Sequence, residues 1–412
     1  MTTDIDVEKS TASSNGSNIP MMTLQELAAD SHGTFRRYRR EHPVVRHEMG
    51  AYFVLRFADI EQCSKDRRLI SGETAIPKMT GFNQGVIFDA FVYGMLTANG
   101  DVHRRRRAPF SKLFAARAIS EMRPRIRRTV ETLIDSWYNN GEVDLIESFS
   151  APLPARIIAD LFGLPEADIP DFTRDAYLVT GVFKFGMGPD EIAEIEQAGR
   201  RLRDYVEKIL DERRRSPRDD FLTAFLAAAD EASELSPEEM IFQIFLLIAA
   251  ATDTTRVAMV MQVSLLLQHR EQWEAVCRDP ALIPAAVAEA LRVEPSAGAV
   301  SRVSTEDIDI HGTVIPAGSL VALSTMSAMR DESVFNRPDT FDIGRTDQMR
   351  MHAIFGFGVH RCIGEALARA ELEEGLAALT ARIPQLQPDV LPTISGHFGV
   401  RRVDAMRASW KP

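Results

Sequence analysis

The spacing of apolar residues predicts that this chain is mainly helical. From His103 to about Leu226, apolar residues recur at intervals of three and four, which is the spacing of one buried helix face. Glycine and proline interrupt this pattern at Gly141, at Pro165 and across residues 186–189, where we expect helices to end. This part of the chain should therefore fold as a series of helices joined by turns.

A single long helix is predicted over residues 238–269. Ser236 and Pro237 precede it, and these residue types favour the N-cap and the first helical position. Residues 242–251 are apolar on every side, which is typical of a helix buried in the core. A further helix is predicted over residues 280–291.

The β structure is predicted to be minor. Alternating residues indicate strands at 44–47 and 52–56, after a short helix at 24–27. Short strands and turns are expected over residues 303–323. Residues 72–94 have no clear period and many glycines and phenylalanines, so a loop is predicted there. The fold class is therefore mainly α with a minor β part.

Composition adds the domain organisation. The 412 residues are 45% hydrophobic, and the interior contains no repeat and no long linker, so we expect one domain over residues 21–412. Residues 1–20 are rich in small polar residues and are predicted to form a disordered tail. The net charge of −11 argues against nucleic acid or an anionic membrane as a partner.

The chain shows no apolar targeting segment at its start and no N-terminal membrane-spanning stretch, so we expect a soluble, cytoplasmic protein. The chain has three cysteines, Cys63, Cys277 and Cys362. A small and odd number of cysteines argues against a disulfide framework and favours a reducing compartment. A monomer is the default expectation.

Cys362 lies in a glycine-rich loop that runs directly into a helical pattern at residues 365–372. The N-terminus of a helix carries unpaired N–H groups and partial positive charge, which favour thiolate over thiol. Gly364 allows a large flat group to approach the backbone. The alternative is an inert buried cysteine, and that interpretation is preferred for Cys63 and Cys277.

This loop resembles the haem-binding signature of the cytochrome P450 family, F-x-x-G-x-H-x-C-x-G. Every fixed position matches, at Phe355, Gly358, His360, Cys362 and Gly364. The resemblance extends from about residue 20 to Trp410 and implies a single-domain cytochrome P450 fold with a long central helix and a cysteine haem loop. It also implies a soluble bacterial type that holds haem b (Fe-protoporphyrin IX) through the Cys362 thiolate.

Polar residues interrupt the long apolar helix at residues 252–255. They either bond back to carbonyls one turn earlier and bend the helix, or form a site. The family pattern here is [AG]-G-x-[DE]-T-[TS], and the resemblance implies that Thr254 orders oxygen and a water while Asp253 relays protons. The sequence departs from this pattern at Ala251, where the family usually has glycine.

The resemblance also implies ligands for the two haem propionates. His103 and Arg107 fit the family pattern H-x-x-x-R, which places both on one helix face, and Arg302 and His360 match further propionate positions. Phe355 and Gly364 of the loop are implied to contact the cofactor. The intervening arginines at 104–106 are interpreted as a solvated face.

Glu289 and Arg292 match the family pattern E-x-x-R, which implies a structural role beneath the haem loop. Taken alone, such a pair is more often a weak surface ion pair. The arginine that usually completes this group is replaced by Thr340, and Arg345 is a candidate substitute.

By position in the family, the substrate would contact segments around residues 76–95, 178–187, 297–300 and 398–400 and part of the long helix. The high apolar content of these segments favours an apolar substrate of the terpenoid, steroid or aromatic class. The individual candidates are Leu246, Ala249, Ala250, Val300 and Val400.

The resemblance implies a monooxygenase that uses O2 and takes electrons from a separate ferredoxin and its NAD(P)H-dependent reductase. Arginines 104–106 and Arg361 are candidates for a basic docking patch. Three alternatives stay open: a peroxide-driven relative, a haem-containing sensor or ligand-binding protein without turnover, and a helical protein without haem. The Asp253–Thr254 pair disfavours the first two, because peroxide-driven relatives generally lack it and because ligand binding alone needs no proton relay.

Overall fold

The computed structural model describes residues 19–184, 186–232, 234–347 and 353–412. Most of the predicted N-terminal tail therefore lies outside the described residues. Contacts divide the chain into two compact units, which are described separately. Unit 1 comprises Met1–Ile76, Ala288–Cys362 and Ser395–Arg402, and unit 2 comprises Pro77–Val287, Ile363–Ile394 and Val403–Pro412.

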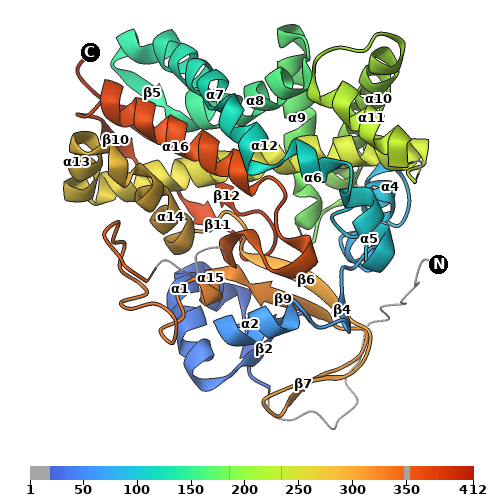
Figure 1. Cartoon of the computed structure of the whole chain (residues 1–412). Coiled ribbons are helices and arrows are strands. Elements are labelled where there is room, and N and C mark those ends of the chain that lie inside the picture. Colours follow the sequence, from blue (N-terminus) through green and yellow to red (C-terminus); the bar gives the residue numbers. More distant parts are fainter. Residues whose placement is uncertain (1–18, 185, 233, 348–352) are drawn as a thin grey trace. The chain divides into compact units, whose positions relative to one another are not determined.

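Unit 1 is built on a six-stranded sheet of order β1-β2-β3-β9-β6-β4 (Figure 1). Its strands are β1 (Met21–Met22), β2 (Val44–His47), β3 (Tyr52–Val54), β4 (Leu69–Ile70), β6 (Ala299–Ser304) and β9 (Leu320–Ser324). A separate hairpin pairs β7 (Ile308–Ile310) with β8 (Thr313–Ile315). The predicted strands at 44–47, at 52–56 and within 303–323 are thus confirmed.

The helices of unit 1 include α1 (Leu24–Glu41), α2 (Phe57–Cys63) and α15 (Thr325–Ala328). The predicted helix at 24–27 is correct but too short. Thr23 and Glu26 form a capping box at its start, and Asp30 leaves helical geometry at a kink. The helix then continues because Phe35 and Tyr38 bury their rings, a gain that the interrupted local pattern did not reveal.

Unit 2 is mainly helical. Its longer helices are α4 (Val86–Tyr93), α5 (Gly100–Arg107), α7 (Ala116–Trp137), α8 (Pro152–Phe162), α9 (Ile169–Thr180), α10 (Pro189–Arg215), α11 (Phe221–Ala232), α12 (Pro237–Gln268), α13 (Arg270–Arg278) and α16 (Glu365–Arg382). The shorter α6 is Phe110–Leu113, and a three-stranded sheet has the order β10 (Gln387–Val390), β13 (Arg407–Ser409), β5 (Glu142–Asp144). The unit boundaries cross α3 (Ala75–Met79), α14 (Ile283–Val293), β11 (Ile394–Ser395) and β12 (Arg402–Val403).

The predicted loop at residues 72–94 is wrong, because α3 and α4 form there. The Glu196 carboxylate, from α10, accepts hydrogen bonds from the backbone N–H groups of Val86 (2.6 Å) and Ile87 (3.2 Å). These N–H groups at the start of α4 need acceptors, and no side chain near them in sequence supplies one, so Glu196 satisfies them from a distant helix. Gly85 precedes the helix with φ of 97°, a conformation suited to glycine.

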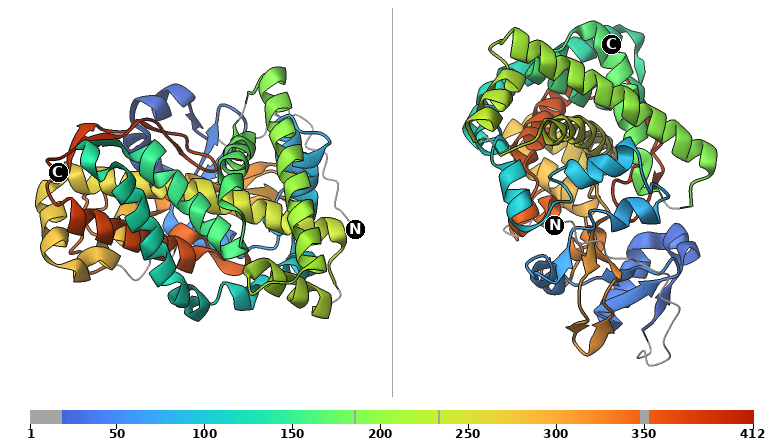
Figure 2. Two further views of the ribbon diagram at one scale, coloured as in Figure 1. Left: turned by 90° about the horizontal axis from the view of Figure 1, so that it is seen from above. Right: turned by 90° about the vertical axis from the view of Figure 1, so that its right-hand side faces the viewer.

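Helix α12 runs among the other helices of unit 2, and packs against α4, α8, α9, α10 and α16 (Figures 1 and 2). Ser236 and Glu239 form a capping box with Pro237 at the first position, so the predicted start is confirmed. Within the described residues, α12 is the one helix whose length and hydropathy would allow a membrane crossing, but 72% of that window is buried inside the protein. The buried core helix of a globular protein can have the same length and hydropathy.

Candidate functional site

The loop that carries Cys362 belongs to unit 1. Gly356 and Gly358 both have positive φ, and the Cys362 N–H donates to the Phe355 carbonyl at 2.8 Å, which closes the loop. The Cys362 side chain is exposed, and α16 begins three residues later, with Gly364 at its N-cap. The two glycines make possible a tight turn that presents a thiol instead of burying it.

The other two cysteines are poor candidates for a thiolate ligand. Cys63 is buried, and desolvation, with the charges of Asp59 and Asp66, raises the pKa of its thiol to about 12. Cys277 is half-buried, and burial also raises the pKa of its thiol. Since metals and electrophiles react with the thiolate, these two side chains are suited to packing. The interpretation drawn from sequence is consistent with their surroundings.

Arg302, on β6, is a buried cation whose polar contact among the described residues is to its own neighbour. Its guanidinium donates to the Ser301 carbonyl at 2.8 Å, and no carboxylate of the described residues pairs with it. Desolvation lowers the pKa of Arg302 to about 10. A buried charge without a counter-ion is destabilising. An anionic group such as a haem propionate fits this residue.

The other predicted propionate ligands occupy both units. In unit 1, His360 Nε2 lies 3.3 Å from Ser71 Oγ, and the His360 ring is half-buried. In unit 2, His103 and Arg107 are one turn apart on α5, with His103 buried and Arg107 half-buried. Phe355 is half-buried. Each of these side chains is suited to an anion or an aromatic ring, but their roles stay predictions.

The interpretation of arginines 104–106 as a solvated face is wrong for two of the three. Glu239, in the first turn of α12, accepts hydrogen bonds from Arg105 (2.7 and 2.5 Å) and from Arg106 (2.9 Å). Arg106 is buried and also donates to the carbonyls of Val92 and Gly94. These arginines therefore tie α5 and the end of α4 to the start of α12. Arg104 alone is exposed.

On α12, the structure shows the back-bonding that was predicted as one interpretation of residues 252–255. Thr252 donates to the Ile248 carbonyl at 3.0 Å and Thr254 to the Ala250 carbonyl at 2.8 Å, so the threonines bond back along the helix. Helix α12 nevertheless continues unbroken through Ala251. Back-bonding thus accounts for the threonine hydroxyl protons and leaves their oxygens able to accept from another group.

Asp253 differs from the threonines because it bonds to other side chains. Thr180, at the end of α9, donates to Asp253 Oδ2 at 2.9 Å, and Arg256 donates to Oδ1 at 2.9 and 2.5 Å. The Arg256 guanidinium lies 4.9 Å from the centre of the Tyr177 ring. A buried carboxylate with these partners is held in place. On α12, the acid is thus engaged by other side chains, whereas the alcohol bonds only along the helix among the described residues.

The predicted substrate contacts differ in exposure. On α12, Leu246 and Thr254 are half-buried and Ala250 is exposed, a spacing of four residues that places them on one helix face, whereas Ala249 lies on the buried side. In unit 1, Val300 and Val400 are both half-buried. The structure therefore leaves four of these five small apolar side chains accessible.

Glu289 and Arg292 form a fully buried pair on α14, not a surface ion pair. Arg292 donates to both Glu289 oxygens at 2.8 Å, and neither side chain is exposed. Arg345 Nε lies 2.8 Å from Glu289 Oε2, but its N–H is not aligned for a hydrogen bond, so the contact is ionic. Arg345 thus adds a second positive charge beside Glu289, in addition to Arg292. It replaces the arginine that the family usually has at the position of Thr340.

Sequence reasoning missed Glu371, on α16. Its side chain is buried, and no group in the described part of the chain forms a hydrogen bond with its Oε2. Desolvation raises the pKa of its carboxyl to about 8. This residue therefore holds a proton at neutral pH. The one local signal was a glutamate at a position where the helical period calls for an apolar residue.

Comparison with known proteins identifies similarity along almost the whole chain. The family model described as Cytochrome P450 matches residues 172–279 and 280–382. The plant-inducible cytochrome P450-pinF1 of Rhizobium radiobacter is 40% identical over 396 residues, which cover 96% of this chain and 94% of that protein.

Solved structures agree. The chain resembles P450BioI in complex with an acyl carrier protein ligated to hexadec-9Z-enoic acid, with a TM-score of 0.87, 28% identity and coverage of 94% of this chain and 100% of that chain. It also resembles a myxobacterial cytochrome P450 in complex with myristic acid, with a TM-score of 0.86, 30% identity and coverage of 94% and 98%.

Proposed function

The chain belongs to the cytochrome P450 family of haem-thiolate monooxygenases, and we propose that it hydroxylates a small apolar molecule with Cys362 as the axial ligand of its haem. Haem bound in this way supplies the activation of O2 and the insertion of one oxygen atom into a C–H bond. The exposed Cys362 side chain, presented by a loop with two positive-φ glycines, is the observation that carries this proposal.

The cofactor is held by cations in this proposal. Arg302 and His360 of unit 1, with His103 and Arg107 of unit 2, would donate to the propionate oxygens. Each hydrogen bond from a charged donor is stronger than a neutral one. For Arg302 the effect is largest, because a propionate would supply the counter-ion that this buried guanidinium lacks.

Asp253 and Thr254 would manage protons. The Thr254 hydroxyl donates to the Ala250 carbonyl, so its oxygen can accept a hydrogen bond from a water. Asp253 is held by Thr180 and Arg256, and it would pass a proton only by exchanging one of these partners for water. The geometry thus favours a relay in which side-chain motion of Asp253 accompanies proton delivery.

The substrate would be apolar. Leu246 and Ala250 of unit 2, and Val300 and Val400 of unit 1, are apolar side chains that stay partly or fully accessible, which suits an apolar ligand. Terpenoid, steroid and aromatic compounds fit this description. The relative bound to myristic acid adds saturated acyl chains to the classes that deserve testing.

The electron donor would be a ferredoxin reduced by an NAD(P)H-dependent reductase. The docking surface proposed from sequence needs revision, because Arg105 and Arg106 are engaged by Glu239. Arg361 is exposed on the cysteine loop, and Val359 on the same loop is 70% exposed. A basic side chain beside an apolar one suits an acidic partner. We therefore centre the docking surface on this loop.

A test begins with carbon monoxide. The reduced protein should give the long-wavelength Soret band typical of thiolate-bound haem, and a Cys362→Ser variant should lose it while retaining its helical circular dichroism. Product formation from an apolar compound, dependent on ferredoxin, reductase and NAD(P)H, distinguishes the monooxygenase from a sensor. A wild-type protein that binds haem without that band would refute the assignment of Cys362.

A further inference from the structure

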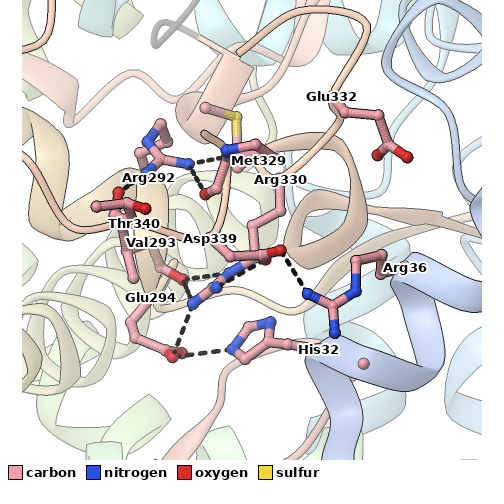
Figure 3. Close-up of polar contacts among 12 residues, drawn as sticks. His32, Arg36, Arg292, Val293, Glu294, Met329, Arg330, Glu332, Asp339 and Thr340 are labelled. Atoms are coloured by element: carbon pink, nitrogen blue, oxygen red, sulfur yellow. Dashed lines mark hydrogen bonds and ion pairs between the residues drawn. The ribbon is translucent and has the colours of Figure 1, made fainter. Parts of the chain in front are cut away.

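Glu294, immediately after α14, gathers three basic side chains from distant parts of unit 1. His32 Nε2, on α1, lies 2.8 Å from Glu294 Oε1, and Arg330 donates to the same oxygen at 3.4 Å (Figure 3). Arg401 donates to Oε2 at 2.5 Å. The Glu294 side chain is only 13% exposed, so this is a buried ionic cluster and not a surface pair.

The cluster is held as charged. Burial alone would raise the pKa of Glu294, but the hydrogen bond from His32 and the charges of Arg401 and Arg330 hold it well below its usual value. Burial lowers the pKa of His32 despite the carboxylate, so the ring is neutral near pH 7. Among the residues described, the negative charge of Glu294 is therefore shared by the two arginines alone. The Arg401 side chain is only 3% exposed, so its charge is compensated inside the protein and not by water.

Arg401 belongs to a segment that pairs with the residues just after Glu294. Its N–H donates to the Ser296 carbonyl, and the Gly298 N–H donates to the Gly399 carbonyl, both at 2.8 Å. Ala297 and Val400 form an antiparallel bridge. Residues 296–300 and 397–401, here called the paired loops, thus lie backbone to backbone, with the Glu294–Arg401 ion pair at one end.

Gly298 allows this close approach. A Cβ atom at Gly298 would lie 2.7 Å from the carbonyl carbon and oxygen of His397, which is closer than such atoms come in proteins. The paired loops also carry Val300 and Val400, two of the predicted substrate contacts. A change in loop separation would therefore move both valines relative to each other.

We propose that Glu294 is a positioning residue for substrate selectivity, which acts through Arg401 to set the separation of the paired loops and so the space between Val300 and Val400. This inference rests on the proposed function, because it takes these valines as substrate contacts. One methylene in an apolar site changes discrimination by roughly 10–200-fold, so a shift of a fraction of an ångström is measurable. Val300 and Val400 are short apolar side chains, so their separation would affect how long an apolar chain can bind beside them.

The experiment uses a homologous series of 1-alkylimidazoles, from methyl to decyl, titrated spectroscopically into the haem-loaded protein. The imidazole binds haem iron whatever the natural substrate is, and the alkyl chain reports the space beside it. The informative variants are Arg401→Met and Gly298→Ala. Arg401→Lys tests rescue, since it restores the positive charge facing Glu294.

We expect Arg401→Met and Gly298→Ala to change the ratio of dissociation constants for the longest and shortest ligands by at least about fivefold. Arg401→Lys should return the ratio to within about twofold of wild type. Two controls should leave the ratio unchanged: Asp339→Asn, which removes contacts of Arg36 and Arg330 in the same network without touching the paired loops, and Gly188→Ala, where a Cβ meets open space.

Three outcomes separate the claims. Wild-type protein without a thiolate-type carbon monoxide spectrum would refute the proposed function and this inference with it. A correct spectrum with an unchanged ligand ratio in folded Gly298→Ala and Arg401→Met would overturn the inference alone. An equal change of the ligand ratio in Asp339→Asn would also overturn the inference, because any loss of an ion pair in this network would then have the same effect. If Arg401→Met fails to fold, Glu294→Gln decides, because it weakens the Glu294–Arg401 pair while keeping the side chain's size; an unchanged ligand ratio in that variant would overturn the inference.

Discussion

At the residue scale, the side chains of greatest functional interest are ionisable groups that are buried without a charged partner. Among the described residues, Arg302 is a buried cation whose partner is a backbone carbonyl, and Glu371 is a buried acid with an unpaired oxygen. Ordinary core positions avoid both situations because an uncompensated polar group is destabilising. Each therefore provides a test that separates a functional role from packing.

Arg302→Met should have opposite effects in the two states of the protein. Without haem, removal of an unpaired buried charge should raise the free energy of unfolding by about 1–3 kcal/mol. With haem, loss of a charged hydrogen bond worth roughly 1.5–3 kcal/mol should speed haem release by tenfold or more. Urea unfolding of the haem-free protein and haem transfer to apomyoglobin measure the two effects.

The control for this prediction is Arg402→Met, which removes an exposed arginine on β12. It should change neither quantity appreciably. A haem-free Arg302→Met protein that is less stable than wild type would show that the guanidinium has a structural partner in solution.

Glu371→Gln should remove a pH-dependent loss of stability. The folded pKa of Glu371 is about 8 and the ordinary value is 4.5, so the folded state binds the proton more tightly. Its contribution to stability is therefore fully present below about pH 4.5 and is lost as pH rises to 8. The variant should match wild type near pH 4.5 and exceed it by up to a few kcal/mol near pH 8.5.

The measurement is urea unfolding of the haem-free protein across this range, taken as the difference between variant and wild type so that other groups cancel. Glu365→Gln, near the start of the same helix, is the matched control, with its carboxylate already paired with Arg369. Parallel stability profiles for wild type and Glu371→Gln would contradict the raised pKa.

At the element scale, α12 is stabilised at its start by more than its own sequence. Ser236 and Glu239 form a capping box, as the local pattern predicts, but Glu239 also neutralises Arg105 and Arg106 from α5. The same carboxylate thus caps a helix and closes an ion cluster. Because α12 carries Asp253 and Thr254, this contact positions the predicted proton relay from a distance.

Glu239→Gln should therefore destabilise the protein far more than loss of the cap. Ser236→Ala removes one capping hydrogen bond and should cost about 1 kcal/mol. Glu239→Gln leaves Arg106 buried without a counter-charge and should cost roughly 3–5 kcal/mol. Urea unfolding of both variants gives the comparison, and equal losses would mean that the arginines contribute nothing beyond the cap.

The pH dependence has a defined sign. The pKa of Glu239 is lowered to about 2 by the arginines and the Ser236 backbone, which together outweigh desolvation. Its stabilisation is present above the ordinary value near 4.5 and is lost as pH falls towards 2. Wild type should lose stability over that interval, and Glu239→Gln should lose less.

At the scale of the whole molecule, the net charge of −11 conceals local basic surface. An acidic partner is repelled by the average field and attracted only where basic groups are exposed. Arg361 on the cysteine loop is such a group, and the exposed Val359 beside it supplies apolar contact. Electron transfer should therefore depend on this loop.

Arg361→Glu should slow reduction by ferredoxin at least tenfold at low salt, and the difference should shrink as ionic strength rises. Stopped-flow reduction under carbon monoxide measures the rate. Arg278→Glu makes the same charge change at an exposed position on α13 and should have little effect. Equal slowing by both variants would assign the effect to net charge, not to docking.

The sequence by itself determined the family, because a turn that needs several glycines at set spacings around one cysteine leaves little freedom in its residues. It also predicted Cys362 as the haem ligand, which stays a prediction. It also determined the start of α12, since the cap depends on neighbours three residues apart. Periodicity sufficed for most of the other helices for the same local reason.

Only the tertiary structure decided the rest. Glu196 starts α4 from a distant helix, Glu239 turns predicted surface arginines into buried partners, Arg345 supplies the charge missing at Thr340, and Glu294 joins two loops. Each is a charge whose partner lies far away in sequence. The local spacing of residues does not predict such a pair, because the energy of the pair depends on burial and on a distance that only the folded chain creates.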